Sequence, residues 1–360
     1  MANSSYQIAT TPKLYVSYPL FQYASGALDV YSNSDGNNNS FLNDEEMIKL
    51  IQIDPSNQIQ INSNSTYAYL QYRILPSNWT IDDGTDLANF IASNIANFDY
   101  YMILGHNLHT SNVSVETKAI TALSGAALNS LDQTDNINGV NSVPEYDGWS
   151  LMNIGNNSPN SPMGSFRLQF DGDNPTECKI GSVLWGKSYQ FPVNTQLSTS
   201  TKFEYGIKQK STISGKTISS ANWTKPNNWG TEPFGLTEGE EVDNFTRRSG
   251  RRVWKMSFDS LAPDKVMPQN MMMNSNGYTA QDNHTLDAND SSLYNINNSE
   301  DFYSAVVHKT MGGHLPMVLQ IDSSDNSPSN FAIVRMNKDY TVTQKSPLLF
   351  SYSITLTEQI

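Results

Sequence analysis

The residues best suited to bind a metal ion are the histidines of His106-Asn107-Leu108-His109. Imidazole nitrogens bind zinc, but a zinc site needs three or four ligands with supporting partners. The chain has five histidines and one cysteine, and this pair at a strand end points poorly toward one ion. The acidic loops at 132–139 and 171–177 lack the ligand spacing of a calcium loop. We therefore expect no metal site, and a turn at His106 and Asn107 that is hydrogen-bonded to its own backbone.

Groups for covalent or nucleotide chemistry are equally sparse. Cys178 is the only thiol, and it begins an apolar stretch, where a buried and unreactive side chain is the default. A serine nucleophile needs a positioned base, and the chain has no G-x-S-x-G sequence, P-loop or G-x-G-x-x-G sequence. Glycoside hydrolysis needs two carboxylates across a cleft; the acids lie mainly in loops, which leaves this alternative open without favouring it. We expect a protein that is not an enzyme and holds no cofactor.

The charge pattern at 238–252 is the most informative local feature. Four acids are followed directly by four arginines: Glu238, Glu240, Glu241 and Asp243, then Arg247, Arg248, Arg251 and Arg252. One interpretation is a solvated hairpin with local ion pairs, each of which contributes little. The sharper one is an edge of two signs that docks head to tail with an identical subunit, a contact that closes into a ring. We predict a subunit interface at Glu240, Glu241, Arg247, Arg248, Arg251 and Arg252.

Four tryptophans could form a platform on which sugar rings stack: Trp149, Trp185, Trp223 and Trp229. Trp185 lies within an apolar run and is expected in the core. Trp223 and Trp229 lie near Pro226 and several asparagines, so they are the better candidates for an exposed contact with a glycan or a protein. Protein packing is favoured over sugar because aromatic anchors dominate protein interfaces.

Composition limits the classes of partner. A net charge of −13 argues against a nucleic-acid-binding surface, because phosphates are neutralised by lysine and arginine. One cysteine excludes an internal disulfide framework. The N-terminus shows no secretory signal, and no apolar run approaches the roughly 18 residues that span a bilayer. We expect synthesis in a cytoplasm and no membrane insertion.

Most of the chain is predicted to form β-strands. Apolar and polar residues alternate in 349–360 and in the arginine-led segment 247–258, which places one face of each strand against a core. Further strands are expected at 14–19, 66–75, 113–120, 164–170, 178–192, 316–321 and 331–336. Turn residues predict two hairpins, 48–61 around Asp54-Pro55-Ser56-Asn57 and 202–223 with Gly215 near its turn.

Two segments change to helical spacing. One is 81–97, and the other is 300–311, with an N-cap at Asn298 or Ser299 and Gly312-Gly313 beyond its end. The segments 124–165, 224–244 and 262–298 are long and polar. We expect 224–244 to be a long surface loop or arm. A structureless stretch as long as 262–298 is uncommon inside a compact domain, so if it is ordered we expect it to pack on a neighbour.

A family resemblance follows from several of these segments. RRVWKMSF, MGGHLPMVLQID, NFAIVRM and LFSYSITLTE resemble the C-terminal half of tail proteins of tailed bacteriophages, of the distal-tail or baseplate-hub type. FDYYMILGHNL and CKIGSVLWGKSYQFP resemble a jelly-roll module of phage structural proteins, distantly like carbohydrate-binding sandwiches. The resemblance implies a mainly β chain in which N- and C-terminal segments form a tail-tube-like β-sandwich or barrel with one helix. It implies three parts: 1–78 in the barrel scaffold, 79–195 as an inserted jelly-roll-like β-sandwich, and 196–360 as a C-terminal β domain with one helix and long arms.

The function implied is that of a virion structural protein without catalysis. The chain would form a homo-oligomeric ring in the phage tail, at the distal tail, hub or adaptor, and contact other tail proteins. Two alternatives stay open: a carbohydrate-binding protein that contacts a host glycan through the inserted sandwich, and a capsid decoration or head–tail connector protein.

Overall fold

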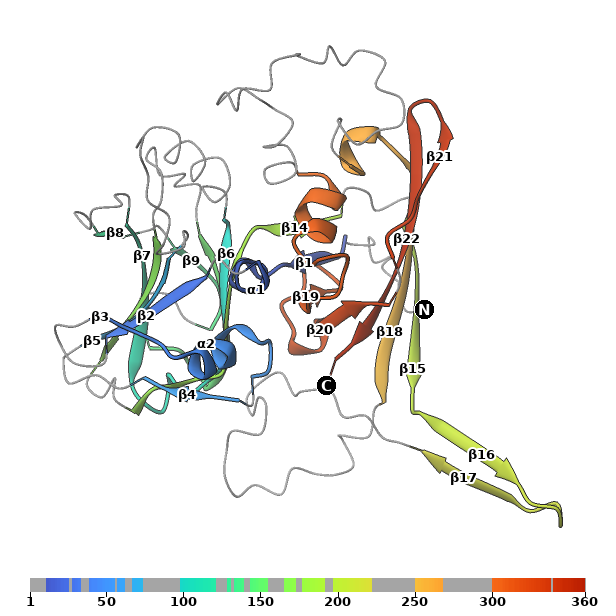
Figure 1. Ribbon diagram of the computed structural model, residues 1–360, viewed down its shortest axis with the longest axis horizontal. Helices are drawn as coiled ribbons and strands as arrows, with labels where there is room; N and C mark the ends of the chain where they lie inside the picture. The colour runs from blue at the N-terminus through green and yellow to red at the C-terminus, as the bar shows by residue number, and fades with distance from the viewer. Residues whose placement is uncertain are drawn as a thin grey trace, which may run out of the picture.

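The computed structural model shows a mainly β chain in which every strand pairing is antiparallel (Figure 1). The residues that it describes are 11–25, 28–33, 39–55, 57–61, 67–73, 98–120, 128–130, 133–138, 143–154, 165–172, 177–191, 197–221, 250–267, 300–337 and 339–359. Within these ranges no helix is long and apolar enough to cross a membrane.

Three sheets carry most of the described chain. The outer sheet has the order β3-β2-β5-β11-β7-β8. Its strands are β2 (Asp29–Asn33), β3 (Asn39–Phe41), β5 (Tyr67–Arg73), β7 (Val113–Ile120), β8 (Leu128–Ser130) and β11 (Ser165–Gly172). The middle sheet has the order β13-β6-β10-β9. Its strands are β6 (Tyr100–His106), β9 (Gln133–Ile137), β10 (Gly148–Ile154) and β13 (Ser182–Gly186).

The long sheet has the order β14-β1-β19-β20-β22-β18-β15, with β21 also paired to β22. Its strands are β1 (Lys13–Tyr15), β14 (Ser188–Gln190), β15 (Leu197–Glu204), β18 (Arg251–Leu261), β19 (Met317–Gln320), β20 (Phe331–Met336), β21 (Val342–Ser346) and β22 (Leu349–Glu358). Two short pairs complete the strands: β4 (Ile59–Gln60) with β12 (Lys179–Ile180), and β16 (Ile207–Ser211) with β17 (Thr217–Ala221).

The middle sheet is buried on both faces. One face packs against the outer sheet, through residues such as Ile103 and Trp185. The other face packs against β1, β19 and β20 of the long sheet, where Trp149 lies 4.9 Å from the ring of Phe331. All seven residues of β6 are therefore buried, which explains the unbroken apolar run in its sequence. The outer and middle sheets form a β-sandwich, and the long sheet adds a third layer (Figure 1).

The long sheet holds a second core on its other face. Strands of the long sheet share this core with a π-helix at Tyr303–His308, which buries Val306 and Val307. The alternation predicted for the last strand is confirmed, because Phe350, Tyr352, Ile354 and Leu356 are all buried. The helix predicted at 300–311 is shorter and of π type. It ends at His308, and Gly312 and Gly313, both with positive φ, follow beyond its end. The predicted N-cap residues lie outside the described residues; instead the carboxylate of Asp301 accepts a hydrogen bond from Ser304 N at 2.8 Å.

The first predicted hairpin is wrong, because its first strand is a helix. Helix α2 spans Asp44–Ile51 and begins with a capping box between Asn43 and Glu46. Met47, Leu50 and Ile51 are buried at helical spacing. The alternation IKLIQI that suggested a strand thus belongs to a helix, and only β4 follows it. The strand predicted at 14–19 likewise ends at Tyr15. Helix α1 (Tyr18–Ala24) follows it, with Ser17 as its N-cap.

The strand pairing brings residues before 78 into the sandwich. Strand β5, which falls in the predicted N-terminal scaffold, pairs along its whole length with β11 of the predicted insert. Strand β2 pairs with β5, so the sandwich reaches back to residue 29. Only the first strand, β1, joins the C-terminal strands, where it pairs with β19.

Of the other sequence predictions, some are confirmed and some are not. The strands predicted at 66–75, 113–120, 164–170, 316–321 and 331–336 are confirmed. The hairpin predicted at 202–223 is confirmed for 207–221; residues 202–204 belong instead to β15, which pairs with β18, and 222–223 lie outside the described residues. The segment 178–192 folds into three short strands, β12, β13 and β14, rather than one. The polar segment 124–165 contains β10, a central strand of the middle sheet. The helix predicted at 81–97 lies outside the described residues.

Candidate assembly surface

One edge of the long sheet extends beyond the core. Strand β15 pairs with β18 over its whole length, yet residues 198–203 are exposed on both faces. Thr199 and Thr201 stand opposite Met256 and Trp254, which are buried, so they share the core-facing side and nothing in the described chain covers them. Its outer edge pairs with no other described strand. Such an edge is a template for pairing with another chain.

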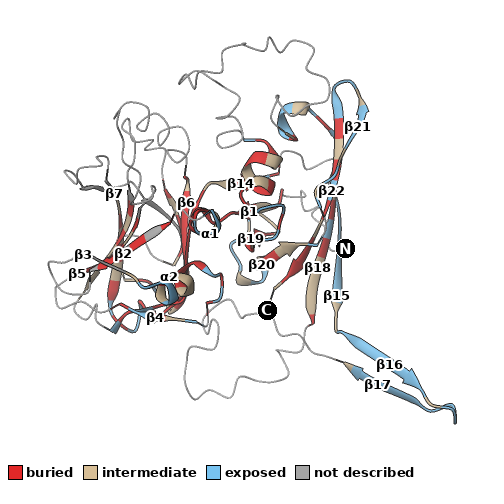
Figure 2. Ribbon diagram, viewed as in Figure 1, coloured by how far each residue is buried: buried red, intermediate tan, exposed pale blue. Residues whose placement is uncertain are grey.

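A two-stranded hairpin continues from this edge. We call residues 205–221, which contain β16 and β17, the arm. It extends away from the three sheets and is exposed along nearly its whole length (Figures 1 and 2). Three isoleucines of the arm are exposed, with relative exposures of 62% for Ile207, 109% for Ile213 and 59% for Ile218. Single exposed apolar side chains are common on protein surfaces, so it is their position on a projecting hairpin that makes the arm a candidate contact surface.

The turn of the arm is well ordered by its own hydrogen bonds. Thr212 accepts a hydrogen bond from Lys216 N at its hydroxyl, 3.1 Å away, and donates its backbone N–H to Lys216 O at 2.8 Å. Gly215 has a φ of +80°, which the turn requires and which a side chain would resist. The sequence prediction placed this glycine at the turn, and the structure confirms it.

The base of the arm is fixed to the long sheet. The Tyr205 ring packs on Gly250, where a Cβ atom would lie 3.1 Å from the ring. Arg251 Nη2 pairs with Glu204 Oε2 at 3.1 Å, and Lys202 Nζ pairs with Glu204 Oε1 at 3.0 Å. Hydrogen bonds from Lys202 and then Arg251 lower the pKa of Glu204. The arm therefore leaves the sheet in one direction.

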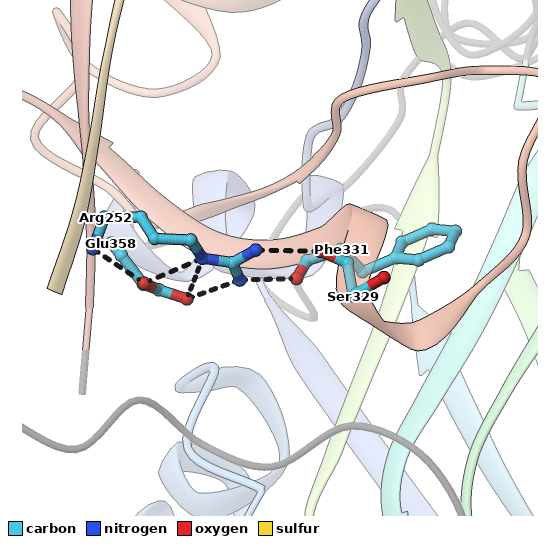
Figure 3. A network of polar contacts seen from close by, with 4 residues as sticks. All are labelled: Arg252, Ser329, Phe331 and Glu358. Carbon is cyan, nitrogen blue, oxygen red and sulfur yellow. Dashed lines mark hydrogen bonds and ion pairs between the residues drawn. The ribbon is translucent and has the colours of Figure 1, made fainter. Parts of the chain in front are cut away.

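Arg252 lies in a network inside the chain (Figure 3). Its guanidinium pairs with the Glu358 carboxylate, with Nη2 2.6 Å from Oε1 and Nε 3.1 Å from both oxygens. It also donates to Ser329 O at 2.8 Å and Phe331 O at 3.1 Å. The Glu358 side chain is 2% exposed and that of Arg252 21%. The network ties β18, β22 and the start of β20 together.

The structure brings two of the six predicted interface residues together with acids, and both acids belong to the same chain. Arg251 and Arg252 bind Glu204 and Glu358 rather than the predicted acids. The remaining four, Glu240, Glu241, Arg247 and Arg248, lie outside the described residues. A docking role for Arg252 would compete with its internal partners. The subunit interface there stays a prediction.

The tryptophans of the proposed platform divide in two. Trp149 and Trp185 are fully buried in different cores, so they do not form one exposed surface. For Trp185 the expectation of a core position is confirmed. Trp223 and Trp229 lie outside the described residues.

The two histidines have separate structural partners. His106 is fully buried, and its Nε2 lies 2.9 Å from Ser150 Oγ while its Nδ1 accepts from Leu108 N at 3.4 Å. His109 Nδ1 lies 2.9 Å from Pro144 O. Burial lowers the pKa of His106 to about 4, so its ring is neutral near pH 7. In the part of the chain that the structure describes, no three side chains of histidine, cysteine, aspartate or glutamate gather as metal ligands would.

Cys178 is fully buried, and burial raises the pKa of its thiol to about 12. The thiolate is the reactive form, so this side chain is inert at neutral pH. The interpretation of Cys178 as a buried core residue is confirmed.

Sequence reasoning missed the arm as a functional feature. It predicted the hairpin but not that both faces are wet. A signal was present: residues 205–221 carry three lysines, no acid and three isoleucines in a chain of net charge −13. A basic stretch with isolated β-branched residues in an acidic chain is unlike a solvated loop.

A second edge lies on the other side of the same strands. Strand β21 pairs only with β22, and three of its five residues are exposed. Lys345 Nζ binds Asp259 Oδ2 at 2.6 Å, which fixes the β21 hairpin over β18. Strand β15 thus lies on one side of the β22–β18 pair, and β20 and β21 pair with different stretches of β22 on the other side.

Comparison with protein-family models, curated proteins and solved structures finds no match for this chain.

Proposed function

We propose that the chain is a non-enzymatic structural subunit of a tailed-phage virion that forms a ring in the tail. The observation that carries this proposal is strand β15, whose residues 198–203 are exposed on both faces and along one edge. A long edge strand without proline or inward charge is costly in a free monomer because it invites pairing. A neighbouring subunit would cover it.

Two edges that no other described strand covers, one at β15 and one at β21, suggest how the ring would close; the far end of the sheet is β14. The edge at β15 and the edge at β21 differ in sequence and lie on opposite sides of the β22–β18 pair. Pairing one edge of a copy with the other edge of the next is a heterologous contact, which generates a ring when the rotation closes. The tail-tube-like barrel implied by the sequence resemblance is the closed form of such a sheet. The resemblance also supports the tail as the location.

The experiment is the mass of the purified chain by native mass spectrometry across a range of concentrations. We expect a closed oligomer of one size. Lysine at both Thr199 and Thr201 places charge on the uncovered face of β15, so the double variant should be monomeric. A control variant carries lysine at Gln52 and Asn57, exposed residues of the sandwich, and should keep the parent mass.

Wild-type protein that stays monomeric at every concentration would overturn the proposal. So would a Thr199→Lys/Thr201→Lys variant that assembles as well as its control. Far-ultraviolet circular dichroism of both variants checks that the sheets remain folded.

A further inference from the structure

The arm is a basic element in an acidic protein. Between Tyr205 and Ala221 it carries Lys208, Lys210 and Lys216 and no aspartate or glutamate. Because the whole chain carries −13 and the arm +3, the remaining residues together carry −16. The lysines of the arm are therefore attracted to the excess negative charge that the rest of the chain carries.

One face of the arm combines charge with an apolar side chain. Lys210 is directly opposite Ile218, and Lys208 is opposite Ser220, so these four residues share one side of the ribbon. The other side carries Ile207, Gln209 and Ser219, with no charge. A face of lysines around an isoleucine matches a surface that offers carboxylates around an apolar patch.

The arm has little to hold it in place by itself. An isolated two-stranded hairpin is at best marginally stable in water. Every residue of β16 and four of five in β17 are exposed, so the rest of the described chain covers little of this pair. Its direction is nevertheless fixed at the base by Tyr205 and Gly250. A preformed, aimed and uncovered hairpin is suited to docking.

We propose that the arm docks on the acidic surface of a second copy of this chain. The charge complementarity between the arm and the remainder of the chain carries this choice of partner. Nucleic acid would also attract three lysines, but the tip has no aromatic side chain on which a base could stack. The inference rests on the proposed function, to which it adds a contact distinct from the β15 edge.

The experiment depends on the chain having one thiol, which is buried, so that a single introduced cysteine can be labelled. Ser214 is exposed at the tip, so Ser214→Cys provides an accessible thiol, whereas Cys178 is buried and unreactive. The variant is labelled with a maleimide–benzophenone reagent, irradiated at low salt, and digested for mass spectrometry. We expect cross-links to a second copy. Mixing chains labelled with heavy and light nitrogen distinguishes links between copies from links within one chain.

A matched pair of charge variants tests the recognition. Glutamate at Lys208, Lys210 and Lys216 in the Ser214→Cys background should lower the yield of cross-links between copies by about tenfold, since three screened ion pairs are lost and replaced by repulsion. Arginine at the same positions should retain the yield. Salt at about 1 M, where the Debye length is about 3 Å, should lower the wild-type yield in the same direction.

The outcomes separate this inference from the function on which it rests. An oligomer of the expected mass with no cross-links from the tip between copies overturns the docking of the arm and leaves the ring in place. A monomer overturns both. A yield that is equal in the glutamate and arginine variants overturns the electrostatic recognition, and protection of the tip by a DNA oligonucleotide, with no cross-links between copies, assigns the arm to nucleic acid instead.

Discussion

The ion pair between Arg252 and Glu358 gives the sharpest stability prediction. Glu358 is 2% exposed, so Arg252→Met leaves a carboxylate buried without its charged partner. Breaking a buried pair from one side costs about 3–5 kcal/mol, because an uncompensated charge remains. The loss of the contact between the guanidinium and the Trp254 ring, 5.0 Å away, adds to this cost. We therefore expect Arg252→Met to lower the free energy of unfolding by about 4 kcal/mol.

Removing the acid of this pair, rather than the arginine, should cost less stability. In Glu358→Leu the guanidinium keeps its bonds to Ser329 O and Phe331 O, and its side chain has some access to water, being 21% exposed. We expect a loss of about 1–3 kcal/mol. Replacing both partners by apolar residues of similar size is often close to neutral. The double variant should thus be more stable than Arg252→Met alone.

Urea unfolding followed by tryptophan fluorescence measures the four members of this cycle. If the protein is oligomeric, all four are compared at one concentration, because assembly shifts the midpoint. A cost below about 1 kcal/mol for Arg252→Met, or a double variant less stable than both single ones, would show that the network contributes little. The same result has a practical side: charge reversal at Arg252 would break this internal pair, so it is not a clean test of a subunit interface.

Two further predictions concern the sandwich. The pKa of His106 falls from about 6.5 to about 4 on folding, so between these pH values the unfolded chain binds a proton that the folded chain does not. The free energy of unfolding is therefore lost as pH falls from about 6.5 to 4, by up to about 3 kcal/mol. His106→Gln should make the urea midpoint less dependent on pH across that window, and an unchanged pH slope would contradict the assignment. Gly105→Ala would place a Cβ atom 2.0 Å from Pro55 O at a φ of +69°, and should destabilise by more than about 2 kcal/mol. The control Gly215→Ala has a similar φ with no atom within 4 Å, and equal costs for the two would refute a role for the close contact.

The sequence predicted strands β18 and β22 well because each has one buried face, while the other face is at least partly exposed over most of its length. Alternation reports a half-buried strand directly, as at Phe350 to Leu356. The register of β18 against β22 places Trp254 opposite Leu356, which puts both on the core face that the alternation indicates. The π-helix could be located by Gly312 and Gly313, although its hydrogen-bond type could not.

The errors have physical causes. In Met47 to Ile53 a helical period of short length was mistaken for alternation, and the capping box of Asn43 and Glu46 was the signal that would have corrected it. The pairing of β5 with β11 could not be predicted, because the two strands are about a hundred residues apart along the chain and local pattern carries no information about such pairing.

The candidate site was predictable only in part. The charge run led to Arg251 and Arg252, which are indeed paired, but the identity of Glu204 and Glu358 as their partners depends on strand register. The exposure of Ile207 and Ile218 could not be read from a hairpin pattern, because a hairpin is normally covered on one face. Only the contrast in charge between this hairpin and the rest of the chain pointed to a special role.

The middle sheet has no wet face, and this has a mechanical consequence. Tyr100 Oη donates to Val16 O at 2.8 Å, and Asp99 binds Ser188 through both oxygens, so the sandwich is bonded to the long sheet as well as packed on it. A load applied to the outer sheet is therefore passed through the middle sheet to β1 and β14, and along the long sheet to β22 and β18. If copies join at the edges of that sheet, a force on the sandwich of one copy strains its interfaces with the neighbouring copies.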